Sequence, residues 1–293
     1  MNETVINILP TGLRGYIDWC NYGNIEEIRL RVGRKVILHM SGGIEQHIVD
    51  YVISANDMQE TMEYITNFSV YAYESEIKEG FITIKGGHRV GLAGKVVCQG
   101  GKVTTISPIS SINIRVSHQV IGCGDKVMKH ITDNGTYLNT LIISPPGLGK
   151  TTLLRDIVRQ LSDVHNLKIS VIDERSEIAS CYKGIPQNDI GQRSDVYDCC
   201  HKSEGIMLMI RAMSPQVVAV DELGKDDDTK AILEASRCGC KILATVHGDA
   251  VDNFVIGQDR DVNVRDVFDR YVVIKKDIDR SVEVYDRLLR RLI

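Results

Sequence analysis

Two closely spaced glycines are followed by a lysine and two threonines in the segment SPPGLGKTT, which covers residues 144–152. Glycines at such positions let the backbone approach a ligand closely, and the N–H groups of the loop and of a following helix bind phosphate. The segment fits the pattern Gly, four residues, Gly-Lys-Ser/Thr, except that the small residue Ser144 replaces the first glycine. We therefore predict a phosphate-binding loop with these members: Ser144, Pro145, Pro146, Gly147, Leu148, Gly149, Lys150, Thr151 and Thr152.

The polar side chains of this loop have roles in phosphoryl-transfer chemistry. Lys150 would reach the β- and γ-phosphates of ATP, Thr151 would hold Mg²⁺ through its hydroxyl, and Thr152 would lie near the α-phosphate. Further along the chain, the apolar run VVAV leads into Asp221 and Glu222. We predict that Asp221 binds the Mg²⁺ and that Glu222 is the general base for the attacking water. The alternative is that both carboxylates only cap the end of a strand.

The remaining candidates are a histidine and several arginines. The segment KILATVHGD places Thr245 and His247 at the end of another apolar strand, near the expected position of the γ-phosphate. His247 is either a member of the site or simply a polar residue at a strand end. Three arginines in charged segments either contact the γ-phosphate, in their own subunit or across a subunit boundary, or form surface salt bridges: Arg175, Arg193 and Arg211.

These side chains need a scaffold of buried strands and helices. Four near-continuous apolar runs, LNTLIIS, LKISVID, VVAVDE and KILATVH, are typical of strands that are buried on both faces of a parallel sheet. A helix is predicted from Lys150, and its inward stripe consists of Leu153, Leu154, Ile157, Val158 and Leu161. The carboxyl ends of such strands are where open α/β sheets bind ligands. We predict an α/β, RecA-like P-loop ATPase domain over residues 126–293.

A smaller α+β domain is predicted over residues 1–125. In IEEIRLRVGRKVILHM, apolar and charged residues alternate with the period of a half-buried strand, so Ile28, Leu30 and Val32 should face inward. The charged residues between them form either a solvated face or a basic surface for a nucleotide or a partner. A helix is predicted over residues 54–66, and a β-meander is predicted where Gly-Gly pairs interrupt short β-branched runs.

Composition excludes several classes of protein. The 293 residues carry a formal net charge of −4, so the whole chain lacks the basic field of a non-specific nucleic-acid binder. No apolar run approaches the length of a membrane span, and the N-terminus lacks the features of a secretory signal, so we expect a cytoplasmic protein. The spacing of Cys199, Cys200 and His201, and of Cys238 and Cys240, does not fit a zinc knuckle.

Several segments together resemble the family of stage III sporulation protein AA, ATPases that are similar to the secretion motors of type II, type IV and pilus systems. The segments that carry the resemblance span nearly the whole chain: EIRLRVGRKV, GHRVGLAGKVV, SSINIRV, SPPGLGKTTLLRDI, VIDERSEI, PQNDIGQRSDV, LMIRAMSPQVVAVDELG and ATVHGD. Secretion motors have a P-loop, an acidic box, a metal-binding strand and a histidine box. By resemblance, these features fall on Lys150, Glu174, Glu222 and His247.

The resemblance also implies properties that the residues alone do not. In the secretion motors the N-terminal domain contributes arginines to the nucleotide, and by motif position these would be Arg89 and Arg115. The chain departs from those motors in having Asp-Glu instead of Gly-Glu after the metal-binding strand, and in lacking a cysteine tetrad. The resemblance implies that the protein assembles into a ring of six subunits and uses ATP and Mg²⁺. It would act on the mother-cell side of the membrane with a membrane protein of a sporulation channel as partner.

The main alternative is a nucleic-acid-binding ATPase with the same core. Such proteins carry a binding module after the core, whereas this sequence ends in SVEVYDRLLRRLI, whose Arg287, Arg290 and Arg291 form only a small basic edge. We therefore expect no DNA partner. A third possibility is an ATP-switched scaffold without turnover, but a switch does not need the positioned base that Glu222 would supply.

Overall fold

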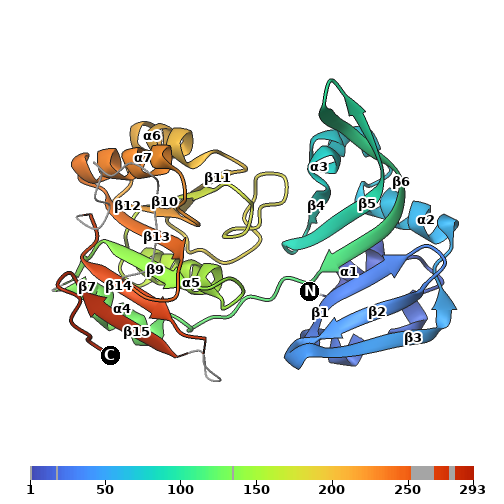
Figure 1. Ribbon diagram of the computed structural model, residues 1–293, viewed down its shortest axis with the longest axis horizontal. Helices are drawn as coiled ribbons and strands as arrows, with labels where there is room; N and C mark the ends of the chain where they lie inside the picture. The colour runs from blue at the N-terminus through green and yellow to red at the C-terminus, as the bar shows by residue number, and fades with distance from the viewer. Residues whose placement is uncertain (1, 18, 134, 252–266, 277–280) are drawn as a thin grey trace. The chain divides into compact units, whose positions relative to one another are not determined.

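The computed structural model describes residues 2–17, 19–133, 135–251, 267–276 and 281–293. The chain forms two compact units, Met1–His118 and Gln119–Ile293, each with its own sheet (Figure 1). The domain boundary that we predicted after residue 125 falls inside the second unit, at the start of helix α4.

The first unit is built on a six-stranded sheet in the order β3-β2-β1-β6-β5-β4, in which every neighbouring pair is antiparallel. Its strands are β1 (Ile25–Arg31), β2 (Lys35–Met40), β3 (Ile44–Val52), β4 (Phe81–Ile84), β5 (His88–Gln99) and β6 (Lys102–Arg115). Its α-helices are α1 (Asn2–Ile8), α2 (Ala55–Ile65) and α3 (Glu74–Glu79). The predicted helix over residues 54–66 corresponds to α2. A capping box closes its N-terminus: the Ser54 hydroxyl accepts the Asp57 N–H, and the Asp57 carboxylate accepts the Ser54 N–H.

One inward-facing residue of this unit was predicted wrongly. Ile28 and Leu30 are fully buried in β1, as their spacing indicates, but 39% of Val32 is exposed. Strand β1 ends at Arg31, and Gly33, with φ of 73°, turns the chain into β2. The two-residue alternation therefore stops at the turn, and Val32 has no core to face.

The second unit is built on a seven-stranded sheet in the order β11-β10-β12-β13-β9-β14-β15. All neighbouring pairs are parallel except β14 with β15. Its strands are β9 (Thr140–Ser144), β10 (Ile169–Asp173), β11 (Ser194–Asp198), β12 (Val217–Val220), β13 (Lys241–His247), β14 (Arg270–Ile274) and β15 (Val282–Asp286). A separate two-stranded pair consists of β7 (Thr132–Asp133) and β8 (Thr136–Tyr137).

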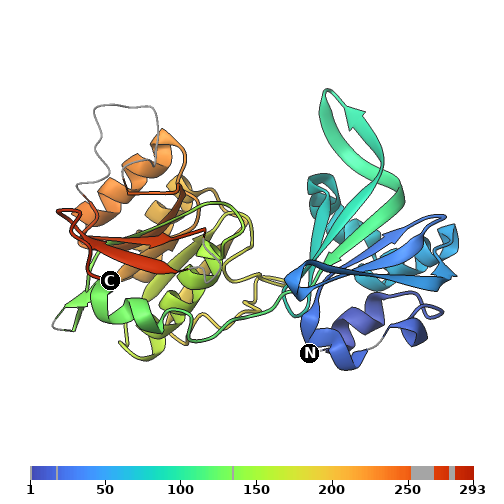
Figure 2. The ribbon, with the colours of Figure 1, turned by 60° about the horizontal axis from the view of Figure 1, so that its bottom comes forward.

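Helices cover both faces of this sheet (Figures 1 and 2). Buried residues of α4 (Asp125–Ile131) and α5 (Lys150–Asp163) share a core on one face, and those of α6 (Lys202–Met213) and α7 (Asp226–Arg237) share a core on the other. The stripe predicted for α5 is buried throughout: Leu153, Leu154, Ile157, Val158 and Leu161. Strands covered on both faces explain why their sequences are continuously apolar.

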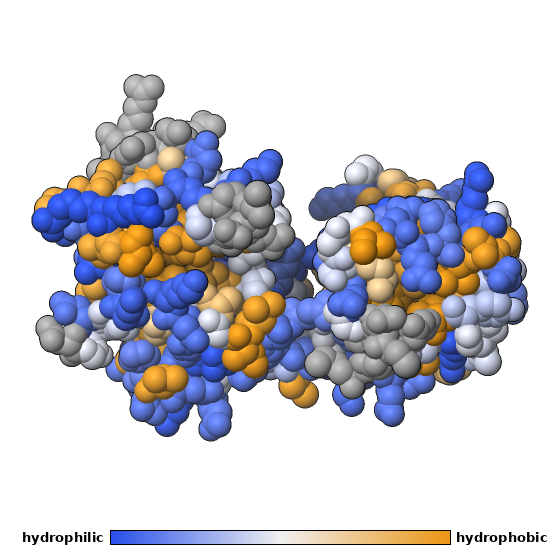
Figure 3. Space-filling view, turned by 90° about the horizontal axis from the view of Figure 1, so that it is seen from below, coloured by the Kyte–Doolittle hydropathy of each residue, from blue (hydrophilic) through white to orange (hydrophobic). Residues whose placement is uncertain are grey.

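The face drawn in Figure 3 is of mixed polarity, with hydrophilic residues interspersed with hydrophobic areas. In the part of the chain that the structure describes, no helix combines the length and hydropathy that a membrane span requires.

Candidate functional site

The predicted phosphate-binding loop connects β9, an interior strand of the sheet, to the start of α5. Ser144 ends β9 and is fully buried, and α5 begins at Lys150. Gly147 and Gly149 have φ values of 77° and 93°, in the left-handed region that side chains other than glycine rarely adopt. The loop therefore depends on both glycines, and its backbone N–H groups precede the positive end of a 14-residue helix.

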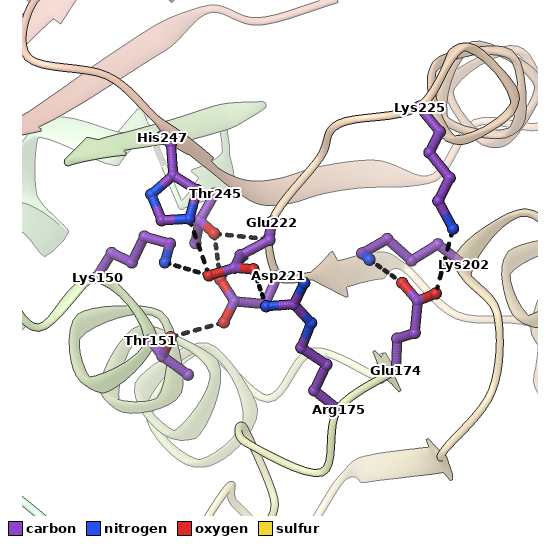
Figure 4. A network of polar contacts seen from close by, with 10 residues as sticks. All are labelled: Lys150, Thr151, Glu174, Arg175, Lys202, Asp221, Glu222, Lys225, Thr245 and His247. Carbon is purple, nitrogen blue, oxygen red and sulfur yellow. Dashed lines mark hydrogen bonds and ion pairs between the residues drawn. The ribbon is translucent and has the colours of Figure 1, made fainter. Parts of the chain in front are cut away.

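Asp221 and Glu222 directly follow β12, which lies beside β13 in the sheet. The Thr151 hydroxyl, from the first turn of α5, donates a hydrogen bond to Asp221 Oδ2 at 2.6 Å. Thr245, from β13, donates its hydroxyl to the other carboxylate oxygen of Asp221 and accepts the Glu222 N–H at 2.8 Å (Figure 4). Residues of α5, β12 and β13, which are distant in sequence, therefore hold the Asp221 carboxylate next to the Thr151 hydroxyl that is predicted to bind metal.

The Glu222 carboxylate lies among three cationic or titratable side chains. Lys150 Nζ donates to Oε1 at 2.6 Å, and His247 Nε2 lies 3.1 Å from the same oxygen. Arg175 Nη1 donates to the other oxygen, Oε2, at 2.5 Å. Only 18% of the Glu222 side chain is exposed, and the residue has φ of 52°, a backbone conformation with a cost of about 1–3 kcal/mol for a non-glycine residue.

These ion pairs determine the charge state of Glu222. Burial by itself raises the pKa of a carboxyl group, because it disfavours the charged form. Here the hydrogen bond and charge of Lys150, together with the charge of Arg175, outweigh burial and hold the pKa of Glu222 below its ordinary value. Glu222 is therefore ionised at neutral pH, as a general base must be.

Glu174 belongs to a second, adjacent group of charged residues. Its carboxylate accepts a hydrogen bond from Lys202 Nζ and lies 3.7 Å from Lys225 Nζ (Figure 4). The carboxylate also lies 3.0 Å from His201 Nδ1. Burial would raise the pKa of Glu174, but the contacts with Lys202 and His201 lower it to about 2. Lys202 is the first residue of α6 and Lys225 precedes α7, so Glu174 binds at the amino ends of both helices.

Two buried residues that we did not predict hold the loop after β10 in place. Asp173, only 1% exposed, accepts backbone hydrogen bonds from Glu177, Ile178 and Ala179 at 2.8–3.0 Å. Arg155 of α5 donates to the carbonyl oxygens of Glu177 and Ile178 at 2.7 and 2.6 Å. The sequence contains a signal for the first residue, since an aspartate at a strand end often accepts hydrogen bonds from the following turn.

We expect Asp173→Ala to destabilise the second unit by about 3 kcal/mol or more, because three backbone N–H groups lose their acceptor. The measurement is urea unfolding, with Asp227→Ala as the matched control, since the Asp227 side chain is 79% exposed. A change no larger than that of the control would show that the loop does not depend on Asp173.

The structure places Arg193 and Arg211 away from the loop of their own chain. The Arg193 N–H donates to Ser162 Oγ, near the end of α5, whereas Lys150 is at its beginning. At 1.5 Å per residue, the two ends of α5 are about 20 Å apart. Arg211 is in the last turn of α6, which leads into the amino end of β12. Among the residues that the structure describes, neither arginine side chain forms an ion pair.

The two arginines of the first unit that the resemblance assigns to the nucleotide are neighbours on its sheet. Arg89 and Arg115 are paired residues of β5 and β6. The Arg89 guanidinium lies 3.7 Å from the centre of the Phe81 ring, and Arg115 Nε lies 3.3 Å from Glu27 Oε1. Their role at the nucleotide remains a prediction.

The arrangement in the second unit fits a nucleoside triphosphate with a divalent cation. The loop supplies N–H donors for phosphate oxygens, and the Lys150 ammonium can exchange Glu222 for a phosphate. Thr151 and Asp221 offer adjacent oxygens, the ligand type that Mg²⁺ prefers. Glu222 and His247 lie at the same carboxyl edge of the sheet, within hydrogen-bond distance of each other.

A comparison with protein families identifies this chain. The family model for sporulation stage III, protein AA matches residues 1–291. The chain belongs to the family of sporulation stage III, protein AA. Within this family, stage III sporulation protein AA of Bacillus subtilis (strain 168) is 41% identical over 262 residues, which cover 87% of this chain and 84% of that protein. The resemblance inferred from the motifs is therefore confirmed.

Solved structures similar to this family member support its fold. The ATPase DotB of Legionella pneumophila superimposes with a TM-score of 0.60 at 16% identity, covering 90% of this chain and 77% of that one. The pilus retraction motor PilT with bound ADP gives a TM-score of 0.57 at 16% identity, covering 85% and 74%. At this level of identity the likeness concerns the fold, and it confirms the α/β, RecA-like P-loop architecture.

Proposed function

We propose that this chain is an ATPase that acts as a motor in bacterial sporulation, in the manner of the secretion ATPases whose fold it shares. The observation that carries the proposal is the position of Glu222. The carboxylate lies between Lys150 of the loop and His247 of β13, beside an Asp221–Thr151 pair suited to a metal ion. A phosphate-binding lysine, a metal-binding pair and an ionised carboxylate at one sheet edge are the parts that ATP hydrolysis requires.

In this proposal the residues act as follows. Lys150 leaves Glu222 and binds the β- and γ-phosphates, while the loop N–H groups hold the phosphate oxygens. Mg²⁺, held by Thr151 and Asp221, would neutralise charge on the β- and γ-phosphate oxygens. The Oε1 atom of Glu222, once released by Lys150, accepts a proton from the water that attacks the γ-phosphorus. His247 can donate a hydrogen bond to the γ-phosphate or hold Glu222 in position.

The finer features of the proposal concern the assembly. We propose that the protein forms a ring, most simply a hexamer, and that it works with a membrane protein of the channel between mother cell and forespore. The family membership supports the process, and the fold shared with DotB and PilT supports a motor.

The second candidate, a nucleic-acid-dependent ATPase, has less support from this chain. Two of the three arginines of its C-terminal basic edge are engaged in ion pairs. Arg290 pairs with Asp286 at 2.7 Å, and Arg291 pairs with Glu283 at 2.9 Å. A surface whose cations are already paired with carboxylates has little attraction for phosphate backbones.

The test is ATP hydrolysis measured with and without single-stranded nucleic acid, together with the mass of the protein in solution. We expect hydrolysis that depends on Mg²⁺, that nucleic acid does not stimulate, and that rises as larger assemblies form. Stimulation by nucleic acid would favour the second candidate. The absence of hydrolysis at every concentration would overturn the proposed activity.

A further inference from the structure

Two consecutive residues after β10, Glu174 and Arg175, connect different parts of the second unit. The Arg175 guanidinium donates to Glu222 Oε2, whereas the Glu174 carboxylate binds Lys202 at the start of α6 (Figure 4). The Lys202 side chain is 7% exposed, so its ammonium is nearly buried and Glu174 is its carboxylate partner. A buried charge pair of this kind is costly to break, since the remaining charge would lose its partner.

The backbone that carries these two residues is fixed relative to the phosphate-binding loop. Asp173 and Arg155 bind the chain directly after Arg175 through five hydrogen bonds of 2.6–3.0 Å. Arg155 is in α5, whose first residue is Lys150. The backbone of Arg175 therefore keeps its position relative to the phosphate-binding loop. Arg175 therefore acts on Glu222 of its own chain.

The contacts of Glu222 are divided between its two oxygens. Among the residues that the structure describes, Lys150 and His247 contact Oε1 and only Arg175 contacts Oε2. Lys150 must leave Oε1 when it binds phosphate, but nothing in that step displaces Arg175 or His247. Arg175 would then fix Oε2, while Oε1, next to His247, would face the position that Lys150 has vacated, where a water molecule can be deprotonated.

We propose that Arg175 is the positioning residue for the catalytic base Glu222, and that the Glu174–Lys202 pair holds Arg175 in place. This inference rests on the proposed ATPase function and adds a residue to it. The link also gives Glu174 a task that does not require contact with nucleotide. Glu174 contacts Lys202 at the amino end of α6 and Lys225 at the amino end of α7. Through Arg175, the positions of these two helix ends would therefore affect the orientation of the Glu222 carboxylate.

The alternative role for Arg175 is direct contact with the γ-phosphate. The two roles predict different kinetic effects, because loss of a ground-state phosphate contact weakens ATP binding, whereas loss of base positioning lowers kcat with little change in KM.

The experiment is the measurement of kcat and KM for the wild-type chain and the variants Arg175→Ala, Arg175→Lys and Lys202→Ala. Lys230→Ala is the matched control, because Lys230 is a 59% exposed lysine of α7 remote from both groups of charged residues in sequence. We expect Arg175→Ala to lower kcat about 10- to 100-fold, a range typical of lost positioning. KM should change less than threefold.

The other variants test how the effect is transmitted. Arg175→Lys retains the charge and should recover only part of kcat, since an ammonium cannot match the guanidinium geometry. Lys202→Ala should change kcat in the same direction as Arg175→Ala, and the double variant should be no worse than Arg175→Ala alone. Additive losses would contradict transmission through Arg175, and a loss confined to KM would assign Arg175 to the phosphate instead.

A further measurement separates failure of this inference from failure of the proposed function. The hydrogen bond between Arg175 and Glu222 joins two side chains of one chain and can be tested without ATP. Arg175→Ala should therefore lower Tm in the wild-type background and lower it less in a Glu222→Gln background, where the carboxylate charge is already absent. An identical change in both backgrounds overturns the coupling between Arg175 and Glu222, whether or not the protein hydrolyses ATP.

Discussion

Lys150→Ala protein should lose ATP binding, whereas Glu222→Gln protein should bind ATP normally and lose turnover by about 10²- to 10⁴-fold, the usual contribution of a general base. The difference arises because Lys150 would bind phosphate in both the ground state and the transition state, while Glu222 would act only on the attacking water. Binding is measured by calorimetry with ATP and Mg²⁺, and turnover by phosphate release under saturating ATP.

The ion pair between these two residues makes a stability control necessary. Lys150 Nζ and Glu222 Oε1 are 2.6 Å apart, with only 9% of the lysine side chain and 18% of the glutamate side chain exposed. Glutamine keeps an acceptor oxygen for Lys150, so Glu222→Gln is expected to fold with a Tm close to that of the wild-type chain. Equal loss of binding in both variants, with Tm preserved, would contradict the division of roles.

The core of the site could be predicted because its signals are local in sequence. The glycines and lysine of the loop are nearly contiguous, and an apolar strand that ends in Asp221 and Glu222 has a single functional orientation in a parallel sheet. The adjacency of β12, β13 and β9 then brings Thr245 and His247 to the same edge. Each of these residues follows or ends a strand whose type was clear from its apolar run.

The neighbours of Glu222 could not be ranked by sequence. Arg175, Arg193 and Arg211 occur in similar charged segments, yet only Arg175 contacts Glu222. The difference depends on which end of a parallel strand each arginine is near, since Arg175 follows the carboxyl end of β10 while Arg193 precedes the amino end of β11. The sequence contains no signal that Lys202 is buried, because its burial arises from its tertiary contact with Glu174 and not from a local pattern.

The position of Arg193 and Arg211 leads to a prediction about the assembly. Both are exposed and lie on the amino side of the sheet strands, so neither reaches the loop of its own chain in this structure. If either contacts the γ-phosphate, it must do so across a subunit boundary. An arginine that acts in this way is commonly worth about 10³- to 10⁵-fold in kcat, so its loss should be at least as severe as loss of Glu222.

Mixing experiments distinguish an arginine that acts in trans from one that acts in cis. Lys150→Ala protein has intact arginines and a defective loop, whereas Arg193→Ala or Arg211→Ala protein has an intact loop. In mixed rings, a Lys150→Ala subunit can supply the missing arginine to its neighbour, so hydrolysis should return to a fraction of the wild-type rate that depends on the mixing ratio. Arg175→Ala is the internal contrast, since its contact with Glu222 lies within one chain and Lys150→Ala protein should not rescue it.

The same series is then extended to Arg89→Ala and Arg115→Ala. If mixing rescues none of the four and a dilute, monomeric wild-type sample retains full activity, each chain contains a complete site and the shared-site arrangement is excluded.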